Sequence, residues 1–384
     1  MKILAIETSC DDTGIAILDV RKDNSFKVLS NIVSSQIKVH AKYGGVYPVM
    51  AKREHQRNLA PVLQKALEKA MLLKVQKLEI SSKKLEVLNK ILEREPELAK
   101  KLISFFKKYR KPNIDLIAVT NGPGLEPCLW VGVNFAKAIS YFWNIPIVDV
   151  NHIKAHIFVN MLGDKKIKEL KQKDFPALCL VVSGGHTQLF LMRDLGKYEI
   201  IGETRDDAAG ECFDKCAKIL DLGYPGGPII SKLAQKSDRS PTPIKLPRPM
   251  INTKDYDFSF SGLKTAVLYA DRKVKIKNAK YKKEMASEIQ QAIIDVLIKK
   301  TLKAVKDFNV KTLILGGGVT ANKELKKQFA TAVKNLIIQR VELFVPPANL
   351  STDNALMTAV AGYFRRNKKI AWQKLEANAN LRVE

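Results

Sequence analysis

The sequence is poor in the features that mark secreted, membrane-bound and disulfide-bonded proteins. Its 384 residues include five cysteines, an odd number scattered over a long chain, which is neither a disulfide framework nor a paired C-x-x-C zinc motif. Cys212 and Cys216, one helical turn apart, are most simply interpreted as small buried residues, with a redox or metal pair as the alternative. No stretch approaches the roughly 18 apolar residues of a membrane helix, and Met1–Glu7 is too short and too soon charged for a signal peptide. We therefore expect a soluble cytoplasmic protein.

Acidic residues are scarce relative to basic ones. The chain has 65 Lys and Arg against 39 Asp and Glu, a formal net charge of +26. Two segments concentrate this charge: residues 71–112 carry 12 basic and five acidic residues, and residues 272–283 carry seven basic residues and no acid. Such runs attract nucleic-acid phosphate at long range, but they are also typical of a solvated protein face. The sequence leaves both interpretations open.

The apolar content is sufficient for two domains of ordinary size. Hydrophobic residues make up 46% of the chain, and its length exceeds the roughly 250–300 residues at which single cores stop growing. Residues 3–18 and 177–192 share one design, in which a short turn of polar or small residues separates two apolar runs. This pattern is typical of a β-hairpin. The sequence therefore indicates two related α/β halves.

Further segments extend these halves. Residues 114–121 and 145–150 are expected to be buried strands that flank a helix around 131–141, as in a βαβ crossover. Apolar residues at near-helical spacing between 71 and 112 predict an added amphipathic helical insert. We expect residues 1–149, completed by a C-terminal helix of about 354–384, to form one lobe and residues 150–353 the other. The remaining predictions are a strand from 312, helices over 284–308 and 323–333, a last helix from about 352 past 363, and a proline-rich loop over 241–249.

His152 and His156 are the clearest candidates for metal ligands. They are separated by one helical turn, so on a helix they share a face and can bind one ion, although two such histidines can also be plain polar surface. A third ligand should be an acid or a histidine, and the candidate is Asp353, where a carboxylate is also favoured as a helix cap. Ile153 stands where H-E-x-x-H metalloproteases have their general-base Glu. A protease of that type is therefore excluded.

Glycine-rich turns suggest a phosphate site. The turns 12–14 and 183–185 consist of small and polar residues, which can hold a phosphate by backbone N–H groups, and residues 316–322 place glycines between a strand and a helix. Each turn alone could be an ordinary tight turn. In this order the three elements resemble the two phosphate loops and the adenosine motif of the actin-like ATPase superfamily.

A further acidic segment, residues 206–215, precedes a glycine-proline turn at 222–228. Capping and turn chemistry would account for both. Alternatively, Asp214 and Gly227 could hold hydroxyl or amide groups of a small molecule.

Taken together, the motifs resemble the TsaD family of tRNA N6-adenosine threonylcarbamoyltransferases. The resemblance runs from residue 1 to about 365 and is interrupted mainly by the 71–112 insert. The segments that carry it are 6–11, 43–46, 121–125, 152–156, 183–187, 206–215, 258–264 and 316–322. The resemblance implies a duplicated actin-like ATPase (ASKHA) fold and a bacterial-type acyltransferase. The implied reaction transfers the threonylcarbamoyl group from threonylcarbamoyl-AMP to N6 of adenosine 37 in tRNAs that read ANN codons, and its product is the modified nucleoside t6A.

The resemblance also implies roles for individual residues and partners. His152, His156 and Asp353 would hold the metal, usually iron with zinc as an alternative, and Asp11 would be the catalytic acidic residue near the reacting group. The implied substrate-binding residues are Val181, Val182, Ser183, Gly184, Gly185, Asp214, Gly227 and Asn322. The implied partners are tRNA, TsaB and the ATPase TsaE, with a stand-alone homodimer as the alternative. Two other functions stay open: a non-catalytic nucleotide-binding scaffold of a tRNA-modifying complex, and a carbamoyltransferase of the same fold.

Overall fold

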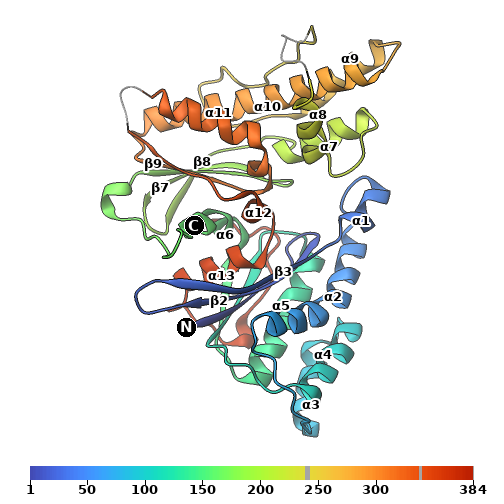
Figure 1. The fold of residues 1–384 in the computed structure, drawn as a ribbon, viewed down its shortest axis with the longest axis vertical. Coiled ribbons are helices and arrows are strands. Elements are labelled where there is room, and N and C mark those ends of the chain that lie inside the picture. The colour runs from blue at the N-terminus through green and yellow to red at the C-terminus, as the bar shows by residue number, and fades with distance from the viewer. Residues whose placement is uncertain (238–242, 337–339, 384) are drawn as a thin grey trace. The chain divides into compact units, whose positions relative to one another are not determined.

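The computed structural model describes residues 1–237, 243–336 and 340–383. Within these residues the chain forms two compact units, each built on one sheet (Figure 1). Unit 1 comprises Met1–Val39, Val46–Lys168 and Asp353–Arg382, and unit 2 comprises His40–Gly45, Glu169–Thr352 and Val383. The helix that carries His152 and His156 therefore belongs to unit 1, not to the unit formed by most of residues 150–353.

The sheet of unit 1 has five strands in the order β3-β2-β1-β4-β5. Their bounds are β1 (Lys2–Glu7), β2 (Asp12–Val20), β3 (Phe26–Ser35), β4 (Leu116–Gly122) and β5 (Ile147–Asn151). β1 pairs antiparallel with β2 and parallel with β4, and β4 pairs parallel with β5. Helix α5 (Glu126–Trp143) joins β4 to β5. This confirms the predicted hairpin and the predicted βαβ crossover.

The sheet of unit 2 repeats this topology. Its strands are β6 (Ala177–Val182), β7 (Thr187–Asp194), β8 (Lys197–Glu203), β9 (Thr312–Gly316) and β10 (Glu342–Phe344). The order is β10-β9-β6-β7-β8, with β6 antiparallel to β7 and parallel to β9, and β9 parallel to β10. Each sheet thus begins with an antiparallel meander and continues with two parallel strands on the other side of its first strand. The prediction of two related α/β halves is confirmed.

The helices match most expectations for the second half of the chain. α10 (Ala279–Asp307), α11 (Lys323–Lys334) and α13 (Ala355–Phe364) cover the three helices predicted there. The expected extent of the C-terminal helix to about 384 is wrong, because α13 ends at Phe364 and the chain then runs along β5, where the Ile370 N–H donates to Ile147 O at 3.0 Å. The other helices of the structure are α1 (Ile37–His40), α2 (Pro48–Lys69), α3 (Ser82–Ile91), α4 (Pro96–Lys108), α6 (His152–Phe158), α7 (Ala209–Ile219), α8 (Gly226–Ala234), α9 (Ser261–Lys273) and α12 (Ala348–Ser351). Among the described residues, no helix combines the length and apolar character required to span a bilayer. Cys212 and Cys216 of α7 are fully buried, which confirms their interpretation as core residues.

The predicted helical insert consists of two short helices, α3 and α4, and its first part, residues 71–81, is not helical. Leu88 and Leu102 are fully buried in the core of unit 1. The ring of Phe106 stacks on Phe142 of α5, with centroids 4.0 Å apart and planes inclined by 14°. Because these residues pack against α5, the segment is part of the unit 1 core and not an appended arm.

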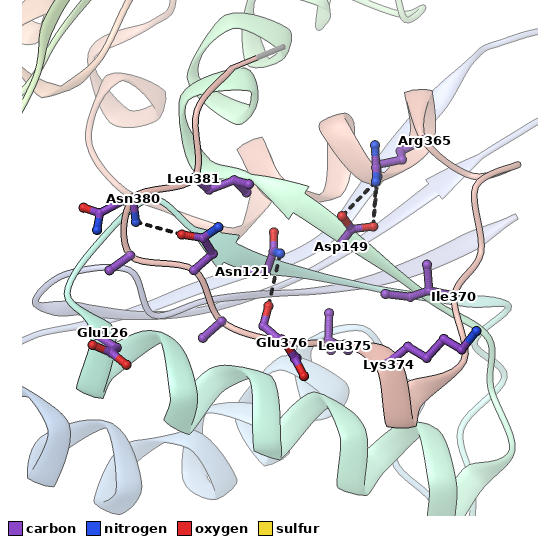
Figure 2. A pocket seen from close by; sticks show the side chains of 13 residues that line it. Asn121, Glu126, Asp149, Arg365, Ile370, Lys374, Leu375, Glu376, Asn380 and Leu381 are labelled. Atoms are coloured by element: carbon purple, nitrogen blue, oxygen red, sulfur yellow. Dashed lines mark hydrogen bonds and ion pairs between the residues drawn. The ribbon is translucent and has the colours of Figure 1, made fainter.

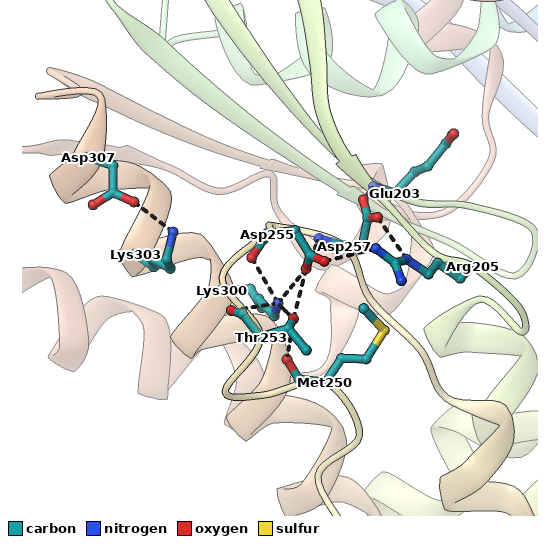
Figure 3. A network of polar contacts seen from close by, with 9 residues as sticks. All are labelled: Glu203, Arg205, Met250, Thr253, Asp255, Asp257, Lys300, Lys303 and Asp307. Atoms are coloured by element: carbon teal, nitrogen blue, oxygen red, sulfur yellow. Dashed lines mark hydrogen bonds and ion pairs between the residues drawn. The ribbon is translucent and has the colours of Figure 1, made fainter.

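A buried lysine anchors the loop before α9 in unit 2. Lys300 of α10 is 1% exposed, and its Nζ donates to Thr253 Oγ1 at 2.5 Å and to Asp255 O and Oδ1 at 2.9 and 3.0 Å (Figure 3). A buried ammonium group is stable only when its donors are satisfied in this way. Of the predicted proline-rich loop, residues 243–249 form no helix or strand, as expected, and residues 241 and 242 lie outside the described residues.

Candidate functional site

The two candidate histidines lie on the first turns of α6, which follows β5 without an intervening loop. Asn151 caps the helix, since its side-chain oxygen accepts a hydrogen bond from the Lys154 N–H at 3.1 Å. The cap fixes where the helix starts and therefore which face carries the histidines. The His152 and His156 rings lie 4.7 Å apart, as expected for neighbours one turn apart.

Asp353 lies beside both histidines. Its Oδ1 is 3.2 Å from His156 Nε2 and 3.7 Å from His152 Nε2. The cap of α13 is the next residue, Asn354, whose side-chain oxygen accepts from the N–H groups of Leu356 and Met357. The alternative interpretation of Asp353 as that helix cap is therefore wrong. The structure brings the three predicted ligands together, with one donor atom of each within 4.8 Å of the others.

The chemistry of this cluster fits a metal ion. His156 is fully buried, its Nδ1 has no hydrogen-bond partner among the described residues, and its Nε2 has only the ion-pair contact with Asp353. Such buried polar atoms are costly unless something binds them. Two imidazole nitrogens and one carboxylate form a donor set that suits iron and zinc. Because His152 is only 6% exposed, the alternative of plain polar surface is also wrong.

A second buried carboxylate, Glu7, contacts the cluster from β1. Its Oε2 lies 3.4 Å from His152 Nδ1. Burial alone would lower the pKa of His152, but the negative charges of Asp353 and Glu7 outweigh burial and raise this pKa to about 9. Burial would raise the pKa of Glu7, and the charge and hydrogen bond of His152 lower it instead. The sequence analysis assigned no role to Glu7, although a charged residue at the end of an apolar strand is a signal for one.

The first turn, between β1 and β2, adds two more carboxylates to unit 1. Burial, followed by the charges of Asp353 and Asp11, raises the pKa of Asp12 to about 7. Asp12 is therefore close enough to Asp353 to feel its charge, and Asp11, the predicted catalytic residue, is the next residue along the turn. His55 of α2, which the sequence analysis missed, holds the turn through its Nδ1, 2.8 Å from Thr13 Oγ1, and its Nε2, 3.0 Å from Cys10 O.

The second turn, in unit 2, contains five of the predicted substrate-binding residues. Val181 and Val182 end β6 with buried side chains, so only their backbone could face a ligand. Ser183 closes the turn, because its N–H donates to His186 O at 2.8 Å and its Oγ accepts from His186 N at 3.1 Å. At Gly184 and Gly185, no described atom lies within 4 Å of the position that a Cβ would occupy. The tip of the turn is therefore open.

Two other glycines let separate motifs meet at this turn. A Cβ on Gly210, at the start of α7, would lie 2.5 Å from Ser183 O, and a Cβ on Gly317, after β9, would lie 2.4 Å from Val182 O. The sequence predicts that the glycines after β9 let the backbone approach a ligand. At Gly317 the protein's own backbone fills the space on the Cβ side, and the ligand role of this turn stays a prediction. The adjacent Gly318 has no described atom within 4 Å of its Cβ position.

The remaining predicted substrate residues have structural contacts in unit 2. Asp214 Oδ1 accepts from the Gly226 N–H at 2.7 Å, which places Asp214 beside Gly227 at the start of α8. The Asn322 side chain caps α11 and donates to Gln290 Oε1 at 2.8 Å. Capping and turn chemistry is thus present at both places, and the ligand roles of Asp214, Gly227 and Asn322 stay predictions.

A cavity of about 540 Å³ in unit 1 lies apart from the predicted site residues, none of which is among the described residues that line it (Figure 2). Its wall includes Asn121, whose side-chain amide donates to Glu376 O at 3.2 Å, and Arg365, whose guanidinium donates to both carboxylate oxygens of Asp149. These contacts tie the C-terminal segment to the sheet. We therefore do not assign this cavity to the candidate site.

Comparison with known proteins decides the family. The family model described as TsaD, tRNA N6-adenosine threonylcarbamoyltransferase, matches residues 27–80 and 92–360. The chain belongs to the TsaD family. Its two five-stranded sheets with surrounding helices agree with the actin-like ATPase fold of this family.

Relatives in the TsaD family align over the whole chain. A protein of Thermosipho africanus is 42% identical over 384 residues, which span both chains completely. Proteins of Persephonella marina and Bacillus cereus are 40% and 41% identical, and the alignments cover this entire chain and 96% of each relative. All three are named tRNA N6-adenosine threonylcarbamoyltransferase. The family is thus one of transferases that act on tRNA.

The comparison corrects the extent of the predicted insert. Of residues 71–112, only 81–91 lie outside the TsaD family model, and they coincide with α3. Helix α4, with its buried Leu98, Leu102 and Phe106, belongs to the matched part. The physical reason is that Phe106 of α4 stacks on Phe142 of α5, so α4 is part of the unit 1 core.

Proposed function

We propose that this chain transfers the threonylcarbamoyl group from threonylcarbamoyl-AMP to N6 of adenosine 37 in tRNAs that read ANN codons, which forms t6A. The observation that carries the proposal is the end-to-end similarity to relatives named for this activity. The intact His152, His156 and Asp353 cluster supports it, because a non-catalytic scaffold would have no need to keep these ligands. Since the substrate is tRNA, we expect the reaction to take place in the cytoplasm.

The metal site belongs to unit 1. His152 and His156 would donate through Nε2 and Asp353 through its carboxylate, with Fe²⁺ as the first choice and Zn²⁺ as the second. Bound there, a divalent ion would act as a Lewis acid that polarises the carbonyl of the threonylcarbamoyl group. Asp11, in the turn after β1 and next to Asp12, is the residue we assign to the reacting group. The new bond joins N6 to the carbamoyl carbon, and the bond from that carbon to the AMP phosphate oxygen breaks.

Unit 2 carries the residues proposed to hold AMP. Small side chains and open space at Gly184 and Gly185 allow a phosphate to approach the backbone N–H groups of the turn. The backbone of Val181 and Val182, the Ser183 hydroxyl, and the polar groups at Asp214, Gly227 and Asn322 would hold the nucleotide. Groups that hold the departing phosphate lower the barrier, because they stabilise charge that develops as AMP leaves.

We assign tRNA binding to the exposed basic runs, above all to residues 272–283. This segment covers the end of α9, the loop to α10 and the first residues of α10. Lys277 pairs with Asp271 and Lys280 with Glu284, and no ion pair of Arg272, Lys273 or Lys275 is found among the described residues. A triple variant, Arg272→Gln, Lys273→Gln and Lys275→Gln, should weaken tRNA affinity. It should also reduce the slope of log affinity against log salt by about one for each residue that contacts a phosphate.

The matched control for this tRNA experiment removes three exposed charges around the β2–β3 connection, by Arg21→Gln and Lys22→Gln in the turn and Lys27→Gln at the start of β3. An equal change of affinity and slope in both triple variants would show that only net charge matters. In that case the basic run would be a solvated face.

The activity itself is tested with purified protein, unmodified tRNA and threonylcarbamoyl-AMP, with nucleosides measured by mass spectrometry. We expect His152→Ala and Asp353→Ala to abolish t6A formation while the fold is retained, and Asp23→Ala, an exposed aspartate of unit 1, to leave it unchanged. Undiminished activity in a folded His152→Ala protein would remove the metal from the mechanism. Formation only with TsaB and TsaE would establish partner dependence. Formation by the chain alone would show that neither partner is required, and the molar mass in solution would then decide whether the active form is a homodimer.

A further inference from the structure

Glu7 is a fully buried carboxylate at the carboxyl end of β1. It is none of the three candidate metal ligands, and no substrate role is assigned to it. A carboxylate is buried only where hydrogen bonds and charges compensate the loss of water. The contacts of the Glu7 carboxylate therefore indicate its role.

Three donors fix the position of the Glu7 carboxylate. The Ser9 N–H donates to Oε1 at 2.8 Å, and the hydroxyls of Thr120 and Thr358 donate to Oε2 at 2.5 and 3.1 Å. They come from the turn after β1, from β4 and from α13. Because every one of these groups donates, the site is built to hold an acceptor, and an ionised carboxylate is the strongest one.

The remaining contact of Glu7 is with His152. The Nδ1 of His152 lies 3.4 Å from Glu7 Oε2 and 3.1 Å from Ser9 Oγ, while its Nε2 faces Asp353. When an ion takes the place of the Nε2 proton, the remaining ring proton is on Nδ1 and is donated towards these oxygens. A carboxylate that accepts from the second nitrogen of a metal-binding histidine fixes the ring orientation and makes the imidazole a better ligand.

We propose that Glu7 is a positioning residue for the metal site, which holds His152 with its proton on Nδ1 and its Nε2 turned towards Asp353 and His156. His156 has no such partner among the described residues, so the orientation of the pair depends on His152. Glu7 and Asp353 together also supply two negative charges, which match a divalent cation and favour it over a monovalent one. The proposal rests on the metal role of the three ligands.

The test measures Zn²⁺ affinity of the full-length chain by competition with a chromophoric chelator. Glu7→Gln keeps the shape of the side chain and removes its charge, and we expect it to weaken Zn²⁺ binding by about 10- to 100-fold. The matched control is Glu95→Gln, which removes another fully buried carboxylate of unit 1 whose hydrogen-bond donor is Asn134. We expect wild-type Zn²⁺ affinity in this control, and Co²⁺ absorption spectra that differ from wild type in Glu7→Gln alone.

A measurement on the wild-type chain keeps the proposal testable if Glu7→Gln does not fold. Isotope-labelled histidine in the Zn²⁺-loaded protein shows by NMR which ring nitrogen binds the ion, and the five histidines keep such a spectrum simple. Coordination of His152 through Nε2, with a proton on Nδ1, supports the role of Glu7. Coordination through Nδ1 would overturn it.

The outcomes separate the two proposals. Wild-type Zn²⁺ affinity in folded Glu7→Gln would overturn the positioning role and leave the metal site standing. An equal loss in Glu7→Gln and Glu95→Gln would mean that Glu7 acts only through general stability, which also overturns it. If the wild-type chain binds neither Zn²⁺ nor Fe²⁺, the metal role of His152, His156 and Asp353 fails, and the role of Glu7 fails with it.

Discussion

Replacement of Gly317 by alanine should destabilise unit 2 strongly. The residue has φ 88° and ψ 160°, a backbone conformation that is open almost only to glycine. An added Cβ would lie 2.4 Å from the carbonyl oxygen of Val182 and 2.7 Å from its carbonyl carbon. Both atoms belong to the backbone of a central strand, so neither can rotate away as the end of a flexible side chain could.

The expected size of the effect follows from these two contributions. Forcing alanine into this conformation costs about 1–3 kcal/mol, and inserting a methyl group into filled space costs about 1–3 kcal/mol more. Alanine also restricts the unfolded chain, which offsets about 0.4–1 kcal/mol. We therefore expect Gly317→Ala to lower the free energy of unfolding by about 1–6 kcal/mol, a large part of the stability of a typical domain.

The assay is urea unfolding followed by circular dichroism, with Gly318→Ala as the matched control. Gly318 is the next residue, its φ is not positive, and no described atom lies near its Cβ position. Its substitution should change the free energy of unfolding by less than about 0.5 kcal/mol. Equal stability of Gly317→Ala and wild type would refute the reasoning, because it would show that Val182 moves away without cost.

Three further predictions concern other parts of the molecule. The free energy of unfolding of Gly185→Ala should lie within about 0.5 kcal/mol of the wild-type value. Its affinity for AMP should fall at least about tenfold, equivalent to about 1.4 kcal/mol, because the added methyl group fills open space at the tip of the turn. Unchanged AMP affinity, measured by calorimetry, would remove this turn from the nucleotide site. Burial raises the pKa of Glu95 above its usual value, so its stabilising contribution is complete at low pH and is lost as the pH rises through the raised pKa; wild type should therefore lose more free energy of unfolding than Glu95→Gln between about pH 5 and about pH 7, and parallel curves would contradict this. Zn²⁺ at about 100 times its Kd should add about 2.7 kcal/mol to the free energy of unfolding of wild type and nothing to that of His156→Ala, and equal stabilisation of both proteins would place the ion elsewhere.

The sequence predicted best what local patterns determine. The two hairpins and the crossover around α5 follow from apolar runs separated by short turns, and each was found. Strand β3 gave no comparable signal, because only one of its ten residues is buried, and β10 has only three residues. The sequence of 71–112 favours an added insert because its many lysines are typical of an exposed segment, although a few apolar residues among them are buried in the unit 1 core.

In the candidate site, too, local patterns identified some residues and could not identify others. His152 and His156 could be identified because they are rare residues at a diagnostic spacing, and Asp353 because an acid was needed to complete the set. The role of Glu7 could not be predicted, since its partners Thr120 and Thr358 are 113 and 351 residues away in the chain. Likewise, only the folded backbone shows that Gly317 packs against Val182.

The most direct test of the account is t6A formation by the purified chain. Unmodified tRNA and threonylcarbamoyl-AMP are incubated with the metal-loaded protein, with and without TsaB and TsaE, and nucleosides are measured by mass spectrometry. The account predicts t6A in the wild-type reaction and none with His152→Ala. Absence of t6A in the wild-type reaction, with both partners and either Fe²⁺ or Zn²⁺ present, would contradict it.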